Sequence, residues 1–233
     1  MNMNVEQLLE KVLDSFSEFD YIRTGDIPTI DLYMDQVTTF MDSKLKNTTR
    51  NPEEDKILTK TMINNYAKSD LLPPPVRKKY TKEHLLVMIF IYYFKSVMSI
   101  GDIEVILNPI TERYFGKSGM GMKDIYTEIL KLEMPQLAGL HADLQEKCEM
   151  AKNSFEDAAD KDKDALQTFA LICMLSMDVF SKKLLIERMV DELAARLEPE
   201  KGEADKKEKK EAKKEAKKEA KKEAKKETKK TEE

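Results

Sequence analysis

Apolar residues recur every three or four positions through most of the first 200 residues, which is the spacing of one face of an α-helix. An amphipathic helix is predicted over residues 4–19, and a second begins near residue 31 and carries Leu32 and Tyr33. Residues 84–97 are apolar on most faces, so this helix should be central. Further helices are predicted over residues 52–57, 60–69, 102–107, 122–134, 136–157 and 163–197.

Strand-like alternation is not convincing anywhere in the sequence. At most, a two-stranded hairpin is predicted around residues 73–80, where Pro73–Pro75 stop the preceding helix and hold an extended segment. Residues 108–121 contain Pro109 and three glycines and are predicted mostly as loop, and Pro135 is predicted to separate two helices. The predicted fold class is therefore all-α, with a small hairpin at most.

The last 33 residues repeat Glu-Ala-Lys-Lys about five times and contain no aromatic and no large apolar side chain. Such a segment cannot bury enough surface to offset its ordering entropy, so residues 199–233 are predicted to be disordered or transiently helical. From Lys201 onward, 15 lysines oppose 10 acidic residues, a net charge of +5. Two interpretations stay open: a solubilising tail, or a non-specific tether for a polyanion.

Composition excludes several classes of protein. Two His and two distant Cys give neither the spacing of a metal site nor a disulfide framework. We predict no cofactor, no bound metal and no enzymatic activity, because the sequence shows no nucleophile–base constellation. The longest apolar runs, Leu85–Phe94 and Phe169–Met177, are too short to span a bilayer, and the N-terminus lacks a signal-peptide pattern. The sequence predicts a cytoplasmic protein without membrane association.

Positive charge is concentrated in one segment of the folded part. Residues 59–82 hold six cations against one acid, Asp70, while the rest of the first 200 residues carries a net charge of −14. A basic segment in an acidic body is typical of a surface that meets an anion, although a solvated surface strip is the simpler alternative. The six cations are Lys60, Lys68, Arg77, Lys78, Lys79 and Lys82.

The order of elements in this segment is that of a helix-turn-helix with a wing. Helix 60–69 can turn Ile63 and Tyr66 inward and leave polar side chains for the major groove, where Asn pairs with adenine and Lys with guanine or phosphate. A basic turn at 77–79 would hold phosphates. The candidate DNA-binding residues are Lys60, Thr61, Asn64, Asn65, Lys68, Arg77, Lys78, Lys79 and Tyr80. For Tyr80 packing is the main expected role, and contact with phosphate is the alternative.

Segments Leu58–Pro75 and Lys79–Leu85 resemble the DNA-binding end of MerR-type winged-helix regulators. In those proteins a recognition helix with a Tyr near its end leads to a Leu-Leu-Pro turn, a basic wing, a Tyr and a new helix. Ser99–Ile103 resembles the segment that closes that domain. The resemblance implies a recognition helix at about 60–69 in the major groove and a wing at 77–79 on phosphates.

The chain departs from the MerR pattern at several places. Thr61 and Asn64 stand where MerR recognition helices usually carry Arg, and Asp70 stands where a Gly normally permits a left-handed cap. The region after residue 110 lacks a long coiled coil leading to a small effector domain. A small-molecule effector is therefore not implied by the resemblance.

A longer part of the chain, roughly residues 20–190, is similar to the domain-of-unknown-function family DUF1836. The similarity is carried by Ile27–Val37, Leu58–Pro75 and Tyr80–Ile103. It implies a cytoplasmic protein that regulates transcription, with no enzymatic activity attached.

Together these features predict three parts: a MerR-like winged helix-turn-helix region with an N-terminal helix (1–110), a C-terminal helical region (111–198) and the charged tail (199–233). The expected function is sequence-specific binding of double-stranded DNA in transcription regulation. A homodimer is expected because one small reading head contacts too few bases. Helix 163–197 is the best candidate for the dimer contact, although one subunit could bury its apolar residues. The alternative is a protein–protein adaptor on a winged-helix scaffold.

Overall fold

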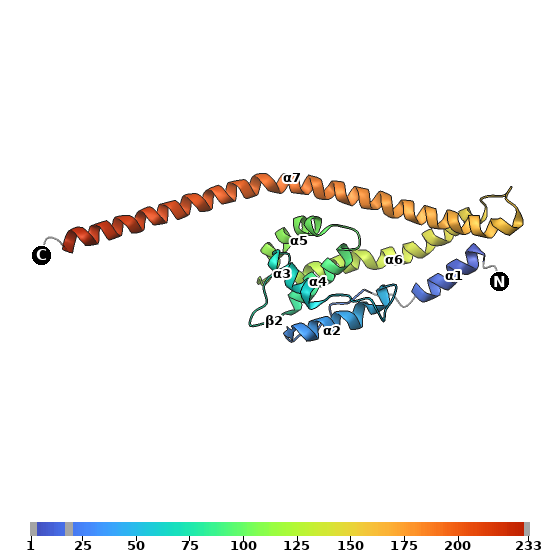
Figure 1. The fold of residues 1–233 in the computed structure, drawn as a ribbon, viewed down its shortest axis with the longest axis horizontal. Coiled ribbons are helices and arrows are strands. Elements are labelled where there is room, and N and C mark those ends of the chain that lie inside the picture. The colour runs from blue at the N-terminus through green and yellow to red at the C-terminus, as the bar shows by residue number, and fades with distance from the viewer. Residues whose placement is uncertain (1–3, 17–20, 231–233) are drawn as a thin grey trace. The chain divides into compact units, whose positions relative to one another are not determined.

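Helices make up most of the chain in the computed structural model, which describes residues 4–16 and 21–230 (Figure 1). The prediction of an all-α fold is confirmed. The elements are α1 (Val5–Phe16), β1 (Leu32–Tyr33), α2 (Met34–Leu45), the 3₁₀ helix η1 (Lys46–Thr48), α3 (Lys60–Lys68), β2 (Lys79–Tyr80), α4 (Lys82–Phe94), α5 (Ile100–Tyr114), α6 (Met122–Lys152) and α7 (Asp160–Lys230).

Helix α4 lies at the centre of the larger core, as its apolar sequence predicts. Its eight consecutive residues from His84 to Ile91 are all buried. Helices α5 and α6 and strand β2 pack against α4, and α2 contacts α3. The hydroxyl of Tyr126 in α6 donates to the carbonyl oxygen of Ile22 over 2.6 Å, which ties the chain before α2 to this core.

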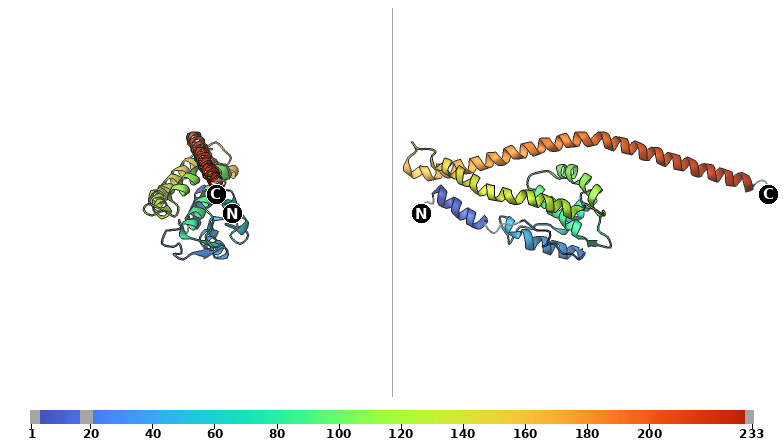
Figure 2. Two further views of the ribbon diagram at one scale, coloured as in Figure 1. Left: turned by 90° about the vertical axis from the view of Figure 1, so that its left-hand side faces the viewer. Right: turned by 180° about the vertical axis from the view of Figure 1, so that it is seen from behind.

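Helix α1 lies beside the C-terminal part of α6 (Figure 2). A smaller apolar cluster joins these two helices to the N-terminal part of α7. Its buried members are Val5, Leu9, Cys148, Ala151 and Leu171. Burial raises the pKa of the Cys148 thiol, so this cysteine is a small core residue rather than a reactive one.

The chain divides into two compact units, Met1–Glu187 and Arg188–Glu233. The predicted boundary at residue 110 lies inside α5, which belongs wholly to the first unit. In the second unit α7 continues through the Lys/Glu/Ala repeats to Lys230, so the tail backbone is helical there and its transience stays a prediction. Within the described residues, no helix combines the length and apolar character needed to cross a membrane.

Two predictions based on proline were wrong. Helix α5 continues through Pro109 to Tyr114, and α6 is one helix through Pro135. Proline removes one backbone donor and crowds the preceding turn, but packing on both sides can outweigh that cost. Residues Ile103 and Thr111 are buried on either side of Pro109, as are Tyr126 and Cys148 around Pro135.

Two shorter helical predictions were also wrong. Residues 52–54 form a turn and residues 55–57 an irregular connection, because only Ile57 there is buried and a helix would gain little by packing. Residues Leu32 and Tyr33 form strand β1 rather than a helical turn, because they pair with β2. Residues 17–19 of the predicted first helix lie outside the described residues.

Candidate nucleic-acid interface

Helix α3 presents one polar face to solvent. The side chain of Thr59 caps the helix by accepting from the Met62 backbone N–H over 3.2 Å. Ile63 (0 % exposed) and Tyr66 (7 %) anchor the opposite face in the core, as predicted. All five sequence-predicted contact residues of this helix are exposed: Lys60, Thr61, Asn64, Asn65 and Lys68.

The chain leaves α3 through a left-handed residue. Asp70 has φ of 58°, the conformation that a glycine would adopt with less strain. The following Leu71 and Leu72 are fully buried, and the Leu72 N–H donates to the carbonyl oxygen of Tyr66 over 3.0 Å. The exit from the helix is therefore fixed by apolar anchoring.

The predicted wing is a two-residue hairpin with a basic tip. Val76 pairs with Lys79 in an antiparallel bridge, and the Lys79 N–H donates to the Val76 carbonyl oxygen over 3.0 Å. The two central residues, Arg77 (φ 52°) and Lys78 (φ 64°), both have positive φ, as in a type I′ turn. Asn-Gly is the favoured sequence for such a turn, so this tip retains two cations at a conformational cost.

Strand β1 holds the wing from the other side. Leu32 pairs with Tyr80 and Tyr33 with Lys79, and the Lys79 ammonium lies 5.2 Å from the centre of the Tyr33 ring. Tyr80 differs from the other candidate residues because only 3 % of its surface is exposed. Its ring packs edge-on against His84, with centroids 5.5 Å apart, which favours the packing role.

Besides Lys79, which lies over the Tyr33 ring, the cations of the basic segment fall into two groups. Lys60 forms an ion pair with Asp35 in the first turn of α2, and Lys82 donates to the carbonyl oxygen of Thr24. Lys68, Arg77 and Lys78 form no ion pair with any described residue. These three charges are thus available to an external anion.

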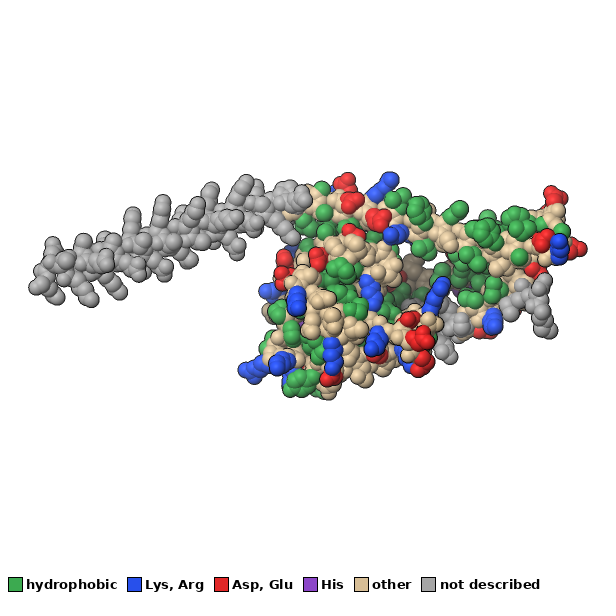
Figure 3. All heavy atoms as spheres, viewed as in Figure 1, with side chains coloured by type: hydrophobic (Ala, Val, Ile, Leu, Met, Phe, Trp, Pro, Cys, Tyr) green, Lys and Arg blue, Asp and Glu red, His purple; other side chains and the backbone are tan. Residues whose placement is uncertain are grey.

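The helix face and the wing lie at the same end of the first unit (Figure 1), where Lys and Arg side chains project (Figure 3). The side chains of Asn64 and Asn65 form no hydrogen bond with the described residues. Asn is a poor helix former, so two exposed asparagines whose side-chain amides form no hydrogen bond contribute little to the stability of the fold. The arrangement offers polar groups for base edges beside cations for phosphates.

His84 is the structural link between α4 and the proline segment. Its Nδ1 accepts from the Thr81 N–H over 3.0 Å, and its Nε2 lies 3.4 Å from the Pro74 carbonyl oxygen. The ring is 1 % exposed and stands edge-on to Phe115. Burial lowers the pKa of His84 below the ordinary value of 6.5, against the backbone hydrogen bonds that raise it, so the neutral ring is the folded form.

This burial predicts a stability loss in mild acid. As the pH falls through 6.5, the unfolded chain protonates His84 before the folded chain does, so the free energy of unfolding falls, by at most about 1.4 kcal/mol per pH unit. Urea unfolding at pH 7.5 and at pH 5.5 measures this change in the free energy of unfolding. H84Q, which retains an acceptor and a donor, should lose this part of the pH dependence, whereas H141Q at an exposed histidine should retain it. Equal pH dependence in all three proteins would refute the assignment.

Comparison with known proteins gives one match. Residues 22–129 match the family model described as Domain of unknown function (DUF1836), a range that includes α3, the wing and α4. This supports the family resemblance predicted from sequence. Comparison with curated proteins and with solved structures gave no match.

Proposed function

We propose that this protein is a sequence-specific regulator of transcription that binds double-stranded DNA in the cytoplasm through a MerR-like winged helix-turn-helix. The proposal rests mainly on one observation: the exposed polar face of α3 lies beside a wing whose Arg77 and Lys78 keep unpaired charges in a costly backbone conformation. A solvated surface strip would give no reason to retain cations there.

Helix α3 would lie in the major groove, with its exposed asparagines toward base edges. A bidentate Asn–adenine pair carries sequence information, whereas Lys68, Arg77 and Lys78 on phosphates set position and register. The ion pair with Asp35 gives Lys60 a second role, since binding phosphate would require it to leave that carboxylate.

A homodimer would bring two such heads to one operator. Between Asp160 and Glu187, helix α7 exposes six apolar side chains by more than half of their surface: Phe169, Ile172, Met177, Val179, Phe180 and Leu185. Soluble monomers rarely expose so many large apolar groups on one helix, so a partner surface is expected there. A second copy fits because two half-sites supply the contacts that one head lacks.

Binding of the full-length protein to DNA from upstream of its own gene tests the proposal. We expect fluorescence anisotropy to show tighter binding to this duplex than to a scrambled one at physiological salt. Binding that ignores sequence and vanishes with salt would reduce the interaction to polyelectrolyte attraction and refute the proposal.

Substitution of Asn64 tests base reading. N64A should lose roughly 1–3 kcal/mol of binding free energy on the preferred duplex and little on others, because it removes one bidentate contact. Asn153, exposed at the end of α6, provides the matched control N153A. Equal loss by N64A on every duplex would contradict base reading by this residue.

The exposed apolar face of α7 also favours a second candidate, a protein–protein adaptor that uses a winged-helix scaffold without specific DNA binding. In that case the basic segment would meet an acidic patch of a protein partner. Affinity capture with nuclease treatment distinguishes the two functions. Nuclease should release partners that are bridged by DNA, whereas partners of an adaptor should remain bound.

A further inference from the structure

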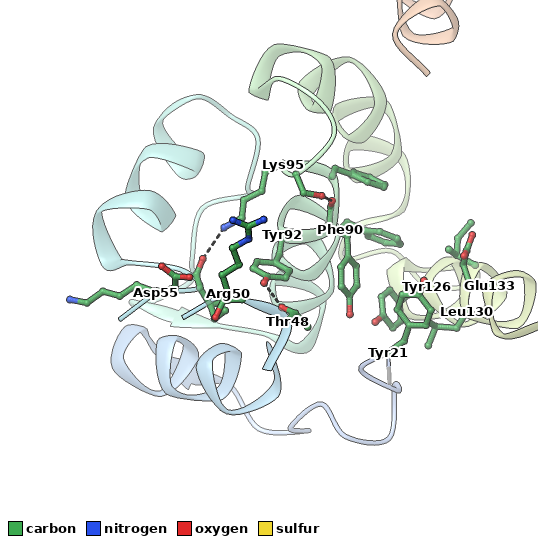
Figure 4. Close-up of a pocket in the computed structure, with 17 residues that line it drawn as sticks. Tyr21, Thr48, Arg50, Asp55, Phe90, Tyr92, Lys95, Tyr126, Leu130 and Glu133 are labelled. Carbon is green, nitrogen blue, oxygen red and sulfur yellow. Dashed lines mark hydrogen bonds between the residues drawn. The ribbon is translucent and has the colours of Figure 1, made fainter. Parts of the chain in front are cut away.

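The first unit contains a cavity of 820 Å³ that the DNA-binding surface does not use (Figure 4). Its wall is largely aromatic and comes from α4, α6 and the chain before α2: Tyr21, Phe90, Tyr92, Tyr93, Tyr126 and Leu130. The rings of Phe90 and Tyr126 stand edge to face, 5.3 Å apart. This volume is that of sites for small organic ligands, and the flat walls suit a planar ring.

One end of the cavity carries positive charge. Lys95 is half-buried, its Nζ donates to the Ile57 carbonyl oxygen over 2.9 Å, and it lies 4.6 Å from the centre of the Tyr92 ring. An ammonium has three donors, and no described carboxylate pairs with this one. Burial lowers the pKa of Lys95, as expected for a cation that lacks a counter-ion.

A second cation stands at the same end. Arg50 lines the cavity and forms no ion pair or hydrogen bond with the described residues. The two acids of the lining are engaged otherwise: Asp55 accepts from the Asn51 N–H over 3.1 Å, and Glu133 bonds to the Tyr21 hydroxyl, whose pKa burial and this carboxylate raise. Among the described residues, neither acid forms an ion pair with Lys95 or Arg50.

We propose that this cavity binds a small aromatic carboxylate, with the anionic group at Lys95 and Arg50 and the ring against the aromatic wall that includes Phe90 and Tyr126. A charge-assisted hydrogen bond satisfies the half-buried ammonium, and the aromatic walls exclude water from the ring. A neutral aromatic compound of the same shape would gain the burial of its ring but not the charge-assisted hydrogen bond. A cation would meet two unpaired positive groups.

The cavity connects to α3 through the chain itself. Residues 48–50 and 55–57 line it, and the Ile57 carbonyl that accepts from Lys95 lies two residues before the Thr59 cap of α3. A ligand at Lys95 would therefore stabilise or displace the segment that begins the recognition helix. This effect on DNA binding rests on the proposed function, whereas ligand binding does not.

Calorimetry with 2-naphthoate and the neutral 2-naphthamide tests the site in the full-length protein. We expect naphthoate to bind at least tenfold more tightly than naphthamide, and K95M to lose this preference, since a hydrogen bond to a charged group contributes about 1.5–3 kcal/mol. R50Q, a change at the rim, should weaken naphthoate binding without affecting the core. The exposed Lys161 provides the control K161M, which should bind as the original protein does.

Three outcomes would overturn the site: no naphthoate binding, equal binding of the two compounds, or unchanged naphthoate binding in both K95M and R50Q. L130W, which fills the cavity from α6, should abolish binding of both compounds and place them in this cavity rather than on α7. DNA affinity with and without naphthoate is measured separately. Absence of specific DNA binding would refute the proposed function, and a DNA affinity that naphthoate does not change would refute the link to α3; both results would leave the ligand site standing.

Discussion

The double variant R77N/K78G is expected to fold more stably than the original protein and to bind DNA more weakly. Both replaced residues have positive φ, where Asn and Gly are less strained than Arg and Lys. The relief of backbone strain should exceed the entropic cost of the new glycine. The free energy of unfolding should therefore rise by about 1 kcal/mol, which corresponds to about 2–4 °C in Tm. The two lost cations remove two phosphate contacts.

Two measurements on this variant have opposite expected signs. Thermal unfolding should shift upward, while affinity should fall for all duplexes alike and the slope of log K against log salt should become shallower by about 1.8. An unchanged salt slope would show that the wing does not contact phosphate. A lowered Tm would show that the left-handed turn is not a source of strain.

Asp70 supplies a matched control for this experiment. It has the same left-handed conformation, with φ of 58°, but carries no positive charge. D70G should therefore raise the stability in the same way and leave DNA affinity undiminished. A loss of affinity in D70G would attribute the wing result to backbone mobility instead of charge.

The second large effect is expected from the apolar face of α7. Phe169 and Phe180 are 62 % and 66 % exposed and lie eleven residues apart, which is three helical turns and places them on one face. F169E/F180E should yield a monomer, because two carboxylates would be buried in the interface. Operator affinity should then fall about 100- to 10,000-fold with the loss of simultaneous binding to two half-sites.

Light scattering after size-exclusion chromatography measures the mass of this variant, and anisotropy measures its DNA affinity. K161E alters the net charge by the same two units in the first turn of α7, away from the apolar face, and should remain dimeric. A double-glutamate protein that stays dimeric and binds the operator normally would exclude this face as the dimer contact.

The recognition-helix candidate could be predicted from the sequence because its determinants are local. Thr59 is a good capping residue, and the spacing of Ile63 and Tyr66 decides which face of α3 turns inward. The left-handed conformation at Asp70 also follows from a local comparison with glycine. The burial pattern of α3 shows which side chains are exposed, but it does not identify the molecule that they bind.

Features that depend on distant parts of the chain could not be predicted. Strand β2 pairs with Leu32–Tyr33, and Lys60 forms an ion pair with Asp35. No pattern of apolar and polar residues in the sequence predicts either contact. The aromatic cavity likewise combines residues from α4, α6 and two connections. Only the assembled fold shows that these residues surround a space.

The pairing of β1 with β2 has a consequence for how the proposed DNA-binding surface forms. Leu32 and Tyr80 are neighbours in space but lie 48 positions apart in the sequence, so the predicted wing gains its second strand only after a long loop closes. The interface should consequently appear late in folding, as part of a cooperative transition. A peptide of residues 59–82 grafted onto another scaffold would lack this strand. We therefore expect the grafted segment not to bind DNA specifically.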